Sequence, residues 1–300
     1  MSNYIKILSD LSNHLGFIDF GIAKIEKIDC EYSHFEEYLQ KGYHAGMKYM
    51  EKNLEKRYNP ALLVDGAKSV ICFLAPYGTK GNKIASFALG MDYHIVIKKK
   101  LNVILDKLNE ISNDSEIKNF NGRVFVDSAP IMERTWAVRA GLGFIGKNNF
   151  LISPQYGLRT FIGEIICNIP YDLFESKRAP IITDCEGCNQ CIEACPSGAL
   201  CAPYTLNAKK CISYHTIEST ELYDIHPVNY NEQIFGCEKC LEVCPWNKKI
   251  PGWPEFETNA DYLLSLTPEN WIRMNESDFK TRLNDSPLKR AGLKKIKNNL

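Results

Sequence analysis

The spacing of apolar residues along the chain predicts an alternation of helices and strands. Apolar positions recur at helical spacing over residues 3–15, 34–54 and 131–140, and from Asp92 through Ile111. Apolar runs bounded by turn residues, which are typical of strands, occupy a segment near residue 20 and residues 69–76, 123–130 and 159–167. This alternation indicates an α/β layered fold for the first 175 residues.

Five residues at or next to the boundaries of the predicted elements are of interest. Pro60 stops any helix before it, and Asp92 is a candidate N-cap that would place His94 in the first helical turn. Asp127 comes at the end of a predicted strand, where α/β folds gather ligand-binding carboxylates. From the sequence alone, however, capping the helix that follows is the favoured role for Asp127. Arg57 and His94, taken alone, are ordinary surface or packing residues.

Eight cysteines form the strongest chemical signal in the chain. The run D-C-E-G-C-N-Q-C-I-E-A-C-P is followed by a lone cysteine and then by G-C-E-K-C-L-E-V-C-P-W. In Cys-x2-Cys-x2-Cys-x3-Cys-Pro, three thiolates hold one iron–sulfur cluster and the fourth ligates a second. The order therefore predicts two [4Fe–4S] clusters with crossed ligands, namely Cys185, Cys188, Cys191 and Cys244 for the first and Cys195, Cys211, Cys237 and Cys240 for the second.

Zinc and disulfide bonds explain this array less well. Zinc sites favour two Cys-x2-Cys pairs with a longer spacer, whereas here the third cysteine follows after two residues. Disulfides need an oxidising compartment, and the N-terminus M-S-N-Y-I-K-I-L lacks a signal-peptide core. The remaining cysteines are expected to be packing residues: Cys30, Cys72, Cys167 and Cys201.

The overall charge is balanced, but the C-terminus is basic. Lys+Arg and Asp+Glu both number 36 in 300 residues, so net charge does not indicate nucleic-acid binding. No apolar run approaches a membrane span, and without a targeting segment a cytoplasmic protein is expected. After Asp285 the sequence has no acidic residue, and such basic runs are usually solvated tails. This run contains Lys289, Arg290, Lys294, Lys295 and Lys297.

A glycine motif imitates a nucleotide-binding loop. Gly141, Gly143 and Gly146 match G-x-G-x-x-G, but a helix rather than a strand is expected before them. A P-loop would also need Ser or Thr after Lys147, where the chain has Asn148. Close backbone packing, or approach to another ligand, is therefore the favoured interpretation.

Several motifs together resemble the epoxyqueuosine reductases over nearly the whole chain. They are V-D-S-A-P-I-M-E-R, A-G-L-G-F-I-G-K-N and the cysteine array, with M-D-Y-H, C-I-S-Y-H-T-I-E and L-K-R-A-G-L in the same order. The resemblance implies an α/β (α+β) cobalamin-binding domain of nitroreductase-like type beside a ferredoxin-like domain with two [4Fe–4S] clusters. It implies reduction of epoxyqueuosine to queuosine at the wobble position of tRNA, with electrons from a low-potential donor.

The resemblance also implies domains and site residues. The expected domains are residues 1–175 for cobalamin and catalysis, 176–255 for the clusters, and 256–300 as a helical segment whose basic tail binds tRNA. Asp127 would be the proton donor for the leaving epoxide oxygen, because deoxygenation consumes two electrons and two protons. The corrin pocket would be lined by Asp127, Arg57, His94, Lys147, Asn148, Ser153 and Ser213.

The chain departs from the family pattern in two places. Asp127 is followed by Ser-Ala-Pro rather than Thr-Gly-Pro, and the sequence ends without the helical-repeat extension that some members carry, which leaves the tRNA footprint open. The alternatives are a corrinoid iron–sulfur reductase of a small molecule, like the reductive dehalogenases, and a non-catalytic electron carrier. The first usually carries a twin-arginine signal, and the second has no need of a large domain before its clusters.

Overall fold

A four-stranded antiparallel sheet forms the centre of the protein. The computed structural model describes residues 3–113, 117, 119–175, 178–219 and 232–300. The strand order is β1-β2-β6-β3, and every neighbouring pair is antiparallel. The expected strands near residue 20 and at residues 69–76 and 159–167 are confirmed. The bounds are Asp19–Lys24 for β1, Ser69–Pro76 for β2, Gly122–Phe125 for β3 and Thr160–Cys167 for β6.

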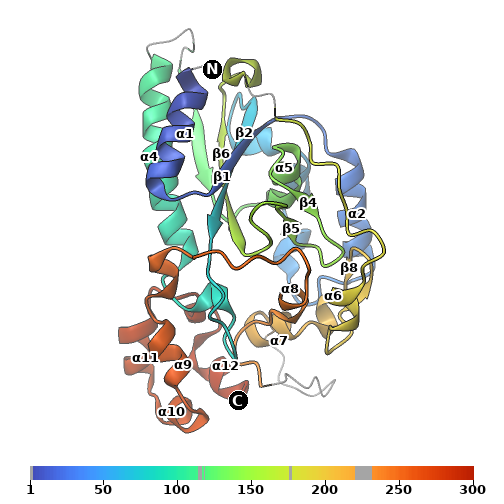
Figure 1. The fold of residues 1–300 in the computed structure, drawn as a ribbon, viewed down its shortest axis with the longest axis vertical. Helices are drawn as coiled ribbons and strands as arrows, with labels where there is room; N and C mark the ends of the chain where they lie inside the picture. Colours follow the sequence, from blue (N-terminus) through green and yellow to red (C-terminus); the bar gives the residue numbers. More distant parts are fainter. Residues whose placement is uncertain (1–2, 114–116, 118, 176–177, 220–231) are drawn as a thin grey trace.

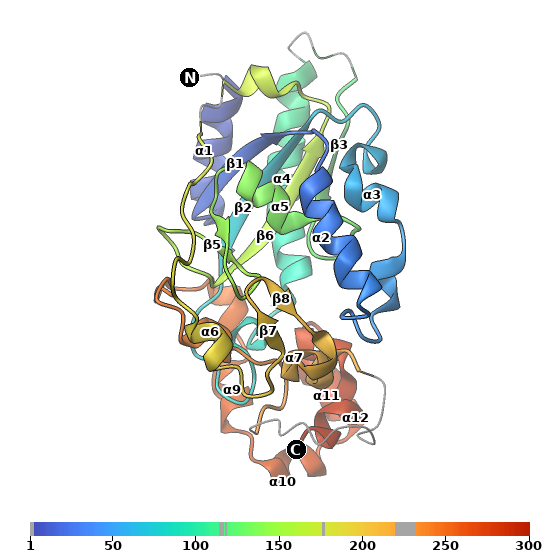
Figure 2. The same cartoon turned by 90° about the vertical axis from the view of Figure 1, so that its right-hand side faces the viewer.

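Helices cover both faces of this sheet (Figure 1). On one face, α1 (Asn3–Leu15) and α4 (Tyr93–Asn113) pack a core in which Leu8 and Leu101 lie with Phe73. On the other face, α5 (Glu133–Arg139) buries Trp136 against β2 and β6. All eight residues of β2 are buried, because this inner strand is covered from both sides. Figure 2 shows α2 (Asp29–Gln40) and α3 (Leu54–Tyr58) on the side of α5.

Two predicted elements are wrong in extent. The helix expected over residues 34–54 is interrupted, because Gly42 and Ala45 have φ angles of 62° and 54°, which a right-handed helix excludes. The chain then forms a 3₁₀ turn at Lys48–Glu51 before α3 begins. The strand expected over residues 123–130 stops at Phe125, since Asp127 takes a φ of 51°.

The cysteine-rich segment lies at one end of the sheet (Figure 2). Its short elements surround the eight cysteines and pack on the hairpin formed by β4 (Phe144–Ile145) and β5 (Leu151–Ile152). Phe144 and Ile152 share a core with Leu241, so this segment is continuous with the preceding domain. The elements are α6 (Gln190–Glu193), β7 (Leu200–Ala202), β8 (Thr205–Leu206), α7 (Ile212–Ile217) and α8 (Lys239–Glu242).

Four helices complete the chain at the end of the molecule away from the N-terminus (Figure 1). Their core joins Trp271 and Phe279 to Ile84 and Phe235, so it crosses the proposed boundary at residue 255. The other proposed boundary, between residues 175 and 176, falls at residues 176 and 177, which lie outside the described residues. The domain limits therefore stay predictions. The helices are α9 (Ala260–Ser265), α10 (Pro268–Arg273), α11 (Glu276–Leu283) and α12 (Gly292–Asn298).

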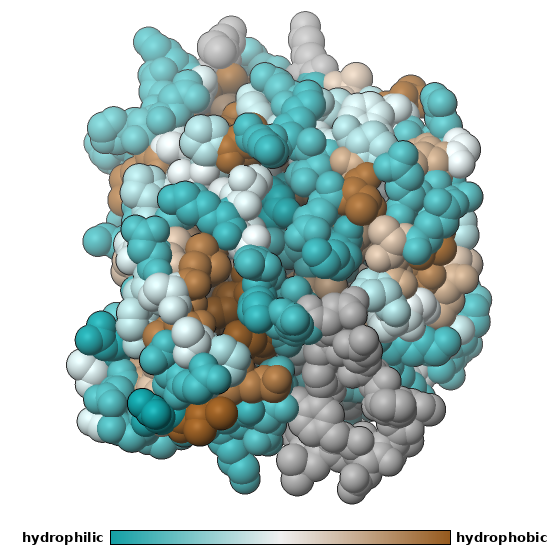
Figure 3. All heavy atoms as spheres, turned by 60° about the horizontal axis from the view of Figure 1, so that its bottom comes forward, coloured by the Kyte–Doolittle hydropathy of each residue, from teal (hydrophilic) through white to brown (hydrophobic). Residues whose placement is uncertain are grey.

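The surface at this end of the molecule is mixed. Figure 3 shows mostly hydrophilic side chains on the face turned forward, with a hydrophobic strip between them. Among the described residues, no helix is both long and apolar enough to span a bilayer.

Candidate functional site

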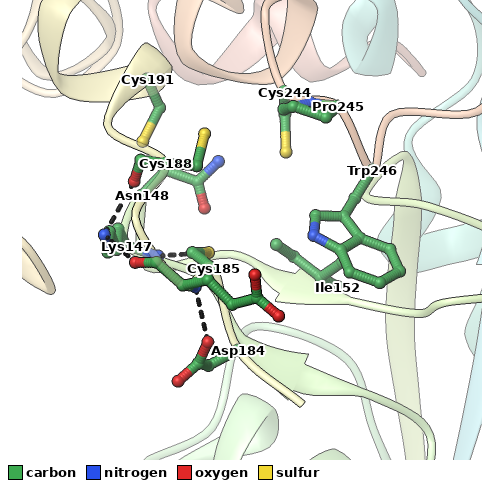
Figure 4. A pocket seen from close by; sticks show the side chains of 11 residues that line it. Lys147, Asn148, Ile152, Asp184, Cys185, Cys188, Cys191, Cys244, Pro245 and Trp246 are labelled. Carbon is green, nitrogen blue, oxygen red and sulfur yellow. Dashed lines mark hydrogen bonds between the residues drawn. The ribbon is translucent and has the colours of Figure 1, made fainter.

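Four of the predicted cluster ligands line one cavity. Cys185, Cys188, Cys191 and Cys244 surround a space of about 210 Å³, and their sulfur atoms turn toward it in Figure 4. Cys185 and Cys188 come from the loop before α6 and Cys191 from α6 itself, whereas Cys244 follows α8, 53 positions after Cys191 in the sequence. The set that the crossed order predicts for one cluster is therefore brought together by the fold, and its role as ligands stays a prediction.

The other four cysteines also lie close together. Burial raises the pKa of Cys240, and the neighbouring Cys237, Cys211 and Cys195 raise it further, in that order. Cys240 lies in α8 and Cys211 immediately precedes α7, so this group gathers residues from three separate parts of the array. Their proximity matches the second predicted set.

Backbone amides point at several of these sulfur atoms. The amide of Lys147 donates to Cys185 Sγ at 3.5 Å, and the amide of Ala199 donates to Cys195 Sγ at 3.2 Å. Burial raises the pKa of Cys195, but amides of Leu200 and Ala199 outweigh it and leave the pKa below that of a free cysteine. Amide donors favour thiolates and tune bound clusters, so the residues present fit iron–sulfur ligation.

The loop after β3 carries Asp127 to a group of polar side chains from α4. Asp127 Oδ2 accepts a hydrogen bond of 2.5 Å from the Tyr93 hydroxyl and lies 3.6 Å from His94 Nε2. Lys98, one turn along α4, donates to Ser128 Oγ at 3.0 Å. Asp127 does not cap α5: that helix begins at Glu133 with Met132 as N-cap, so the capping role expected from the sequence alone is wrong.

His94 lies between two carboxylates. Its Nδ1 is 2.7 Å from Asp92 Oδ1, and its Nε2 faces Asp127. Burial lowers the pKa of His94, but the ion pair with Asp127 and the hydrogen bond with Asp92 outweigh burial and raise the pKa to about 9. Asp92 also accepts the His94 amide at 2.9 Å, which confirms the predicted N-cap. The imidazolium form therefore predominates at neutral pH.

Glu133 is a site residue that the sequence analysis missed. Its Oε1 accepts the Asp127 amide at 2.5 Å and so fixes the left-handed backbone of that residue. Burial and the negative charge of Asp127 raise the pKa of Glu133 to about 8. Burial also raises the pKa of Asp127, yet the nearby His94 imidazolium and the hydrogen bond from Tyr93 hold it below the ordinary aspartate value. Glu133 and Asp127 thus differ in protonation at neutral pH.

Arg57 lies in α3 beside Tyr49. Its Nη2 donates to the Tyr49 carbonyl at 3.3 Å, and its buried Nε has no partner among the described residues. Burial raises the pKa of Tyr49; Glu218 and Asp127 raise it further, while Arg290 and Arg57 lower it. Tyr49 therefore lies among charged groups from four separate segments, and a buried N–H remains for a ligand.

Comparison with known proteins assigns the family. Residues 57–128 match the family model described as Epoxyqueuosine reductase QueG, and residues 184–247 match a 4Fe-4S double cluster binding domain. An epoxyqueuosine reductase of Cellulophaga algicola is 39% identical over 293 residues, covering 94% of this chain and 92% of that protein. One from Pseudomonas aeruginosa is 33% identical and covers 98% and 82%. The chain belongs to the epoxyqueuosine reductase family.

Solved structures of family members share the fold. A crystal structure of epoxyqueuosine reductase with an epoxyqueuosine-modified tRNA-Tyr stem loop has a TM-score of 0.86 at 27% identity, covering 99% of this chain and 80% of that one. A Bacillus subtilis enzyme has a TM-score of 0.85 at 26% identity with the same coverages, and its catalytic aspartate loop is described as swung out of the active site.

Within this epoxyqueuosine reductase fold, four residues predicted to line the corrin pocket face other groups. The Lys147 ammonium is bonded to the loop around Cys188, and Asn148 Nδ2 donates to the Cys240 carbonyl at 3.2 Å. Ser153 is buried in a tight turn, where its hydroxyl accepts the Tyr156 amide at 3.3 Å. Ser213 lies in the first turn of α7 beside Cys211. Corrin contacts by the four stay predictions.

The basic C-terminus is folded rather than a free tail. Leu293 and Ile296 of α12 are buried, and three of the five basic side chains are tied to the protein. Arg290 pairs with Glu218 at 2.7 Å, while Lys295 and Lys297 donate to the carbonyls of Ser219 and Ile272 at 2.6 and 2.8 Å. The side chains of Lys289 and Lys294 are exposed and have no hydrogen-bond partner among the described residues.

The glycine motif serves close packing. A Cβ on Gly143 would lie 2.3 Å from the Ile152 carbonyl oxygen, and one on Gly146 would lie 2.8 Å from Asn148 Oδ1.

Of the four cysteines outside the array, which were expected to be packing residues, only half fit that expectation. Cys72 and Cys167 are buried, whereas Cys30 and Cys201 are exposed.

Proposed function

We propose that this chain reduces the epoxide of epoxyqueuosine, at the wobble position of tRNA, to the alkene of queuosine. The near full-length similarity to proteins named epoxyqueuosine reductase supports this substrate. The observation that carries the proposal is the Tyr93–His94–Asp127 group in a chain that also has a double-cluster domain. A simple electron carrier has no use for such a proton-holding group, which favours an enzyme.

The proposed reaction consumes two electrons and two protons and releases water. Cobalamin, when bound, would supply a low-potential cobalt centre that takes up electrons from the clusters. Arg57, with its buried unpartnered Nε, fits a polar group of such a cofactor. His94 and Asp127 would lie next to the reacting atoms of the substrate, and a low-potential donor would supply the clusters with electrons.

The site supplies protons through a relay rather than from a free aspartic acid. His94 holds a proton at neutral pH, and its Nε2 is directed at Asp127 Oδ2, 3.6 Å away. Asp127 would receive this proton and deliver it to the epoxide oxygen as its C–O bond breaks. Glu133, with a pKa of about 8, holds a second proton next to the Asp127 amide.

The same proposal assigns the tRNA-facing surface. Lys289 and Lys294 are free to contact phosphates, whereas Arg290 is held by Glu218 near Asp127, where it can contact the anticodon close to the wobble base. A tRNA substrate would place the reaction in the cytoplasm.

Asp127→Asn tests the proposal directly. The variant keeps the shape of the side chain but cannot donate a carboxylic proton, so turnover of epoxyqueuosine tRNA should fall by about 100-fold or more. The assay is anaerobic turnover with nucleoside analysis of digested tRNA, at equal iron and cobalamin loading. Asp106→Asn, an exposed change on α4, is the matched control and should keep native turnover. Native turnover by Asp127→Asn would contradict the assigned role, and a fully loaded native chain without activity would contradict the substrate.

A further inference from the structure

We infer that Lys147 and the buried Arg159–Glu238 pair are positioning residues, each of which fixes one of the two cluster-binding loops against the catalytic domain. Lys147 would act on the first cluster, bound by Cys185, Cys188, Cys191 and Cys244. The Arg159–Glu238 pair would act on the second. The inference goes beyond the proposed function, because it depends on the double-cluster domain and is independent of the substrate reduced.

The ammonium group of Lys147 is fully occupied by hydrogen bonds to the loop that carries Cys185 and Cys188. Its Nζ donates to the Glu186 carbonyl at 2.7 Å, the Cys188 carbonyl at 2.8 Å and Asn189 Oδ1 at 3.2 Å. A lysine has three N–H donors, so none remains for another ligand. The Lys147 amide meanwhile donates to Cys185 Sγ. One residue of the catalytic domain thus holds the turn that presents the first cysteines, and it places a positive charge beside their cavity.

Glu238 has the corresponding position in the second loop, between Cys237 and Cys240. Its Oε1 accepts from Arg159 Nη1 at 2.8 Å, and its Oε2 accepts from the Ser86 hydroxyl at 2.7 Å and the Ser86 amide at 3.0 Å. Arg159 and Glu238 are 3% and 6% exposed, respectively. Both carboxylate oxygens of Glu238 therefore have donors. Moving the loop would separate two opposite charges inside the protein, so the buried pair fixes the position of the loop.

The glycine motif explains how adjacent residues reach both loops. Gly143 and Gly146 let the β4–β5 turn fold back tightly, as the contacts of an added Cβ demonstrate. This geometry directs Lys147 to the loop around Cys188 and Asn148 to the Cys240 carbonyl. The motif that resembles a phosphate loop therefore has a different use, which is to join the catalytic domain to the two cluster loops.

Two sets of variants separate the two anchors. Lys147→Met removes the first anchor and its charge, Lys147→Arg keeps the charge, and Lys249→Met removes an exposed lysine near the array as a control. Arg159→Met/Glu238→Leu removes the second anchor without leaving a buried unpaired charge, which keeps the variant foldable. The cluster-loaded protein is studied without tRNA by redox titration of both clusters and by hydrogen exchange followed with mass spectrometry.

Each anchor should affect its own loop. Lys147→Met should raise hydrogen exchange of residues 184–190 by about tenfold, leave residues 236–243 unchanged and lower the midpoint potential of one cluster, because a nearby positive charge favours the reduced form. Lys147→Arg should restore that potential. The double variant should raise exchange in residues 236–243 alone. Unchanged exchange and potentials, or equal effects on both loops, would overturn the inference. Because no substrate is present, either result is independent of whether the chain acts on epoxyqueuosine.

Discussion

The pKa of His94 provides a prediction that can be worked through quantitatively. His94 has a carboxylate at each ring nitrogen, Asp92 at 2.7 Å and Asp127 at 3.6 Å, and its pKa is raised to about 9 from the ordinary 6.5. At pH 8, about 90% of a group with a pKa of 9 is protonated, compared with about 3% of a group with a pKa of 6.5. Proton supply at pH 8 should therefore exceed that of an ordinary histidine by about 30-fold.

The direction of the pH dependence follows from this raised pKa. Turnover should be highest near neutral pH and should fall on the alkaline side, as Glu133 loses its proton near pH 8 and His94 loses its proton near pH 9. By the same linkage, the stability that His94 contributes to the fold is complete below pH 6.5 and is lost as the pH rises through about 9. The assay is the pH profile of kcat, with the rate of cluster reduction measured separately at each pH.

Asp92→Asn is the matched perturbation. Asparagine caps helices as well as aspartate does, so α4 should keep its N-cap while His94 loses one of its two negative neighbours. An opposite charge this close shifts a pKa by about one to three pH units, so the alkaline fall in turnover should move down by at least about one unit. An intact enzyme whose turnover already falls near pH 6.5, or an Asp92→Asn profile identical to the native one, would refute the reasoning.

Three further predictions follow from the site. Anaerobically reconstituted protein should hold about eight irons, and Cys195→Ala should damage the second cluster more than the first, whereas four irons or stoichiometric zinc would contradict the crossed set. Neutralising Lys289 and Lys294 should lower the salt dependence of tRNA binding by about one unit per lost phosphate contact, and an unaltered slope would remove them from the interface. Gly143→Ala should lower the melting temperature by several degrees in thermal unfolding, because its Cβ would meet the Ile152 carbonyl; an unchanged melting temperature would contradict this packing role.

The cysteine array and the main strands could be predicted because their signals are local. The cysteine spacing is typical of a double-cluster domain, whose family model residues 184–247 match, and the continuous apolar run of β2 indicates burial from both sides. The N-cap at Asp92 is also local, since its acceptor and donor are two residues apart. The same reasoning failed for the helix expected over residues 34–54, where the positive φ of Gly42 and Ala45 interrupts the apolar spacing.

The proton-holding group could not be assembled from the sequence. Asp127 was singled out by an argument that applies to parallel sheets, whereas β3 and β6 are antiparallel, so its position depends on the loop after β3 and on α4. Glu133 and Tyr93 carry no signal of their own, because the first acts through the amide of Asp127 and the second through a contact 34 residues away. Lys147 was assigned to the corrin pocket by resemblance alone, and the sequence does not reveal that its side chain faces the loop around Cys188.

Residues of α5 connect the proton-holding group with the second predicted set of cluster ligands. Glu133, the first residue of α5, accepts the Asp127 amide, and Arg134 follows it directly. Burial raises the pKa of Tyr38 to about 12; the Arg134 guanidinium lowers it, whereas the Tyr49 hydroxyl and the Cys211 thiol raise it. Tyr38 therefore has both Arg134 and a predicted ligand of the second cluster as neighbours. A cluster held by that set would be coupled electrostatically to the groups around Asp127, because Arg134 interacts with Glu133 as well as with Tyr38.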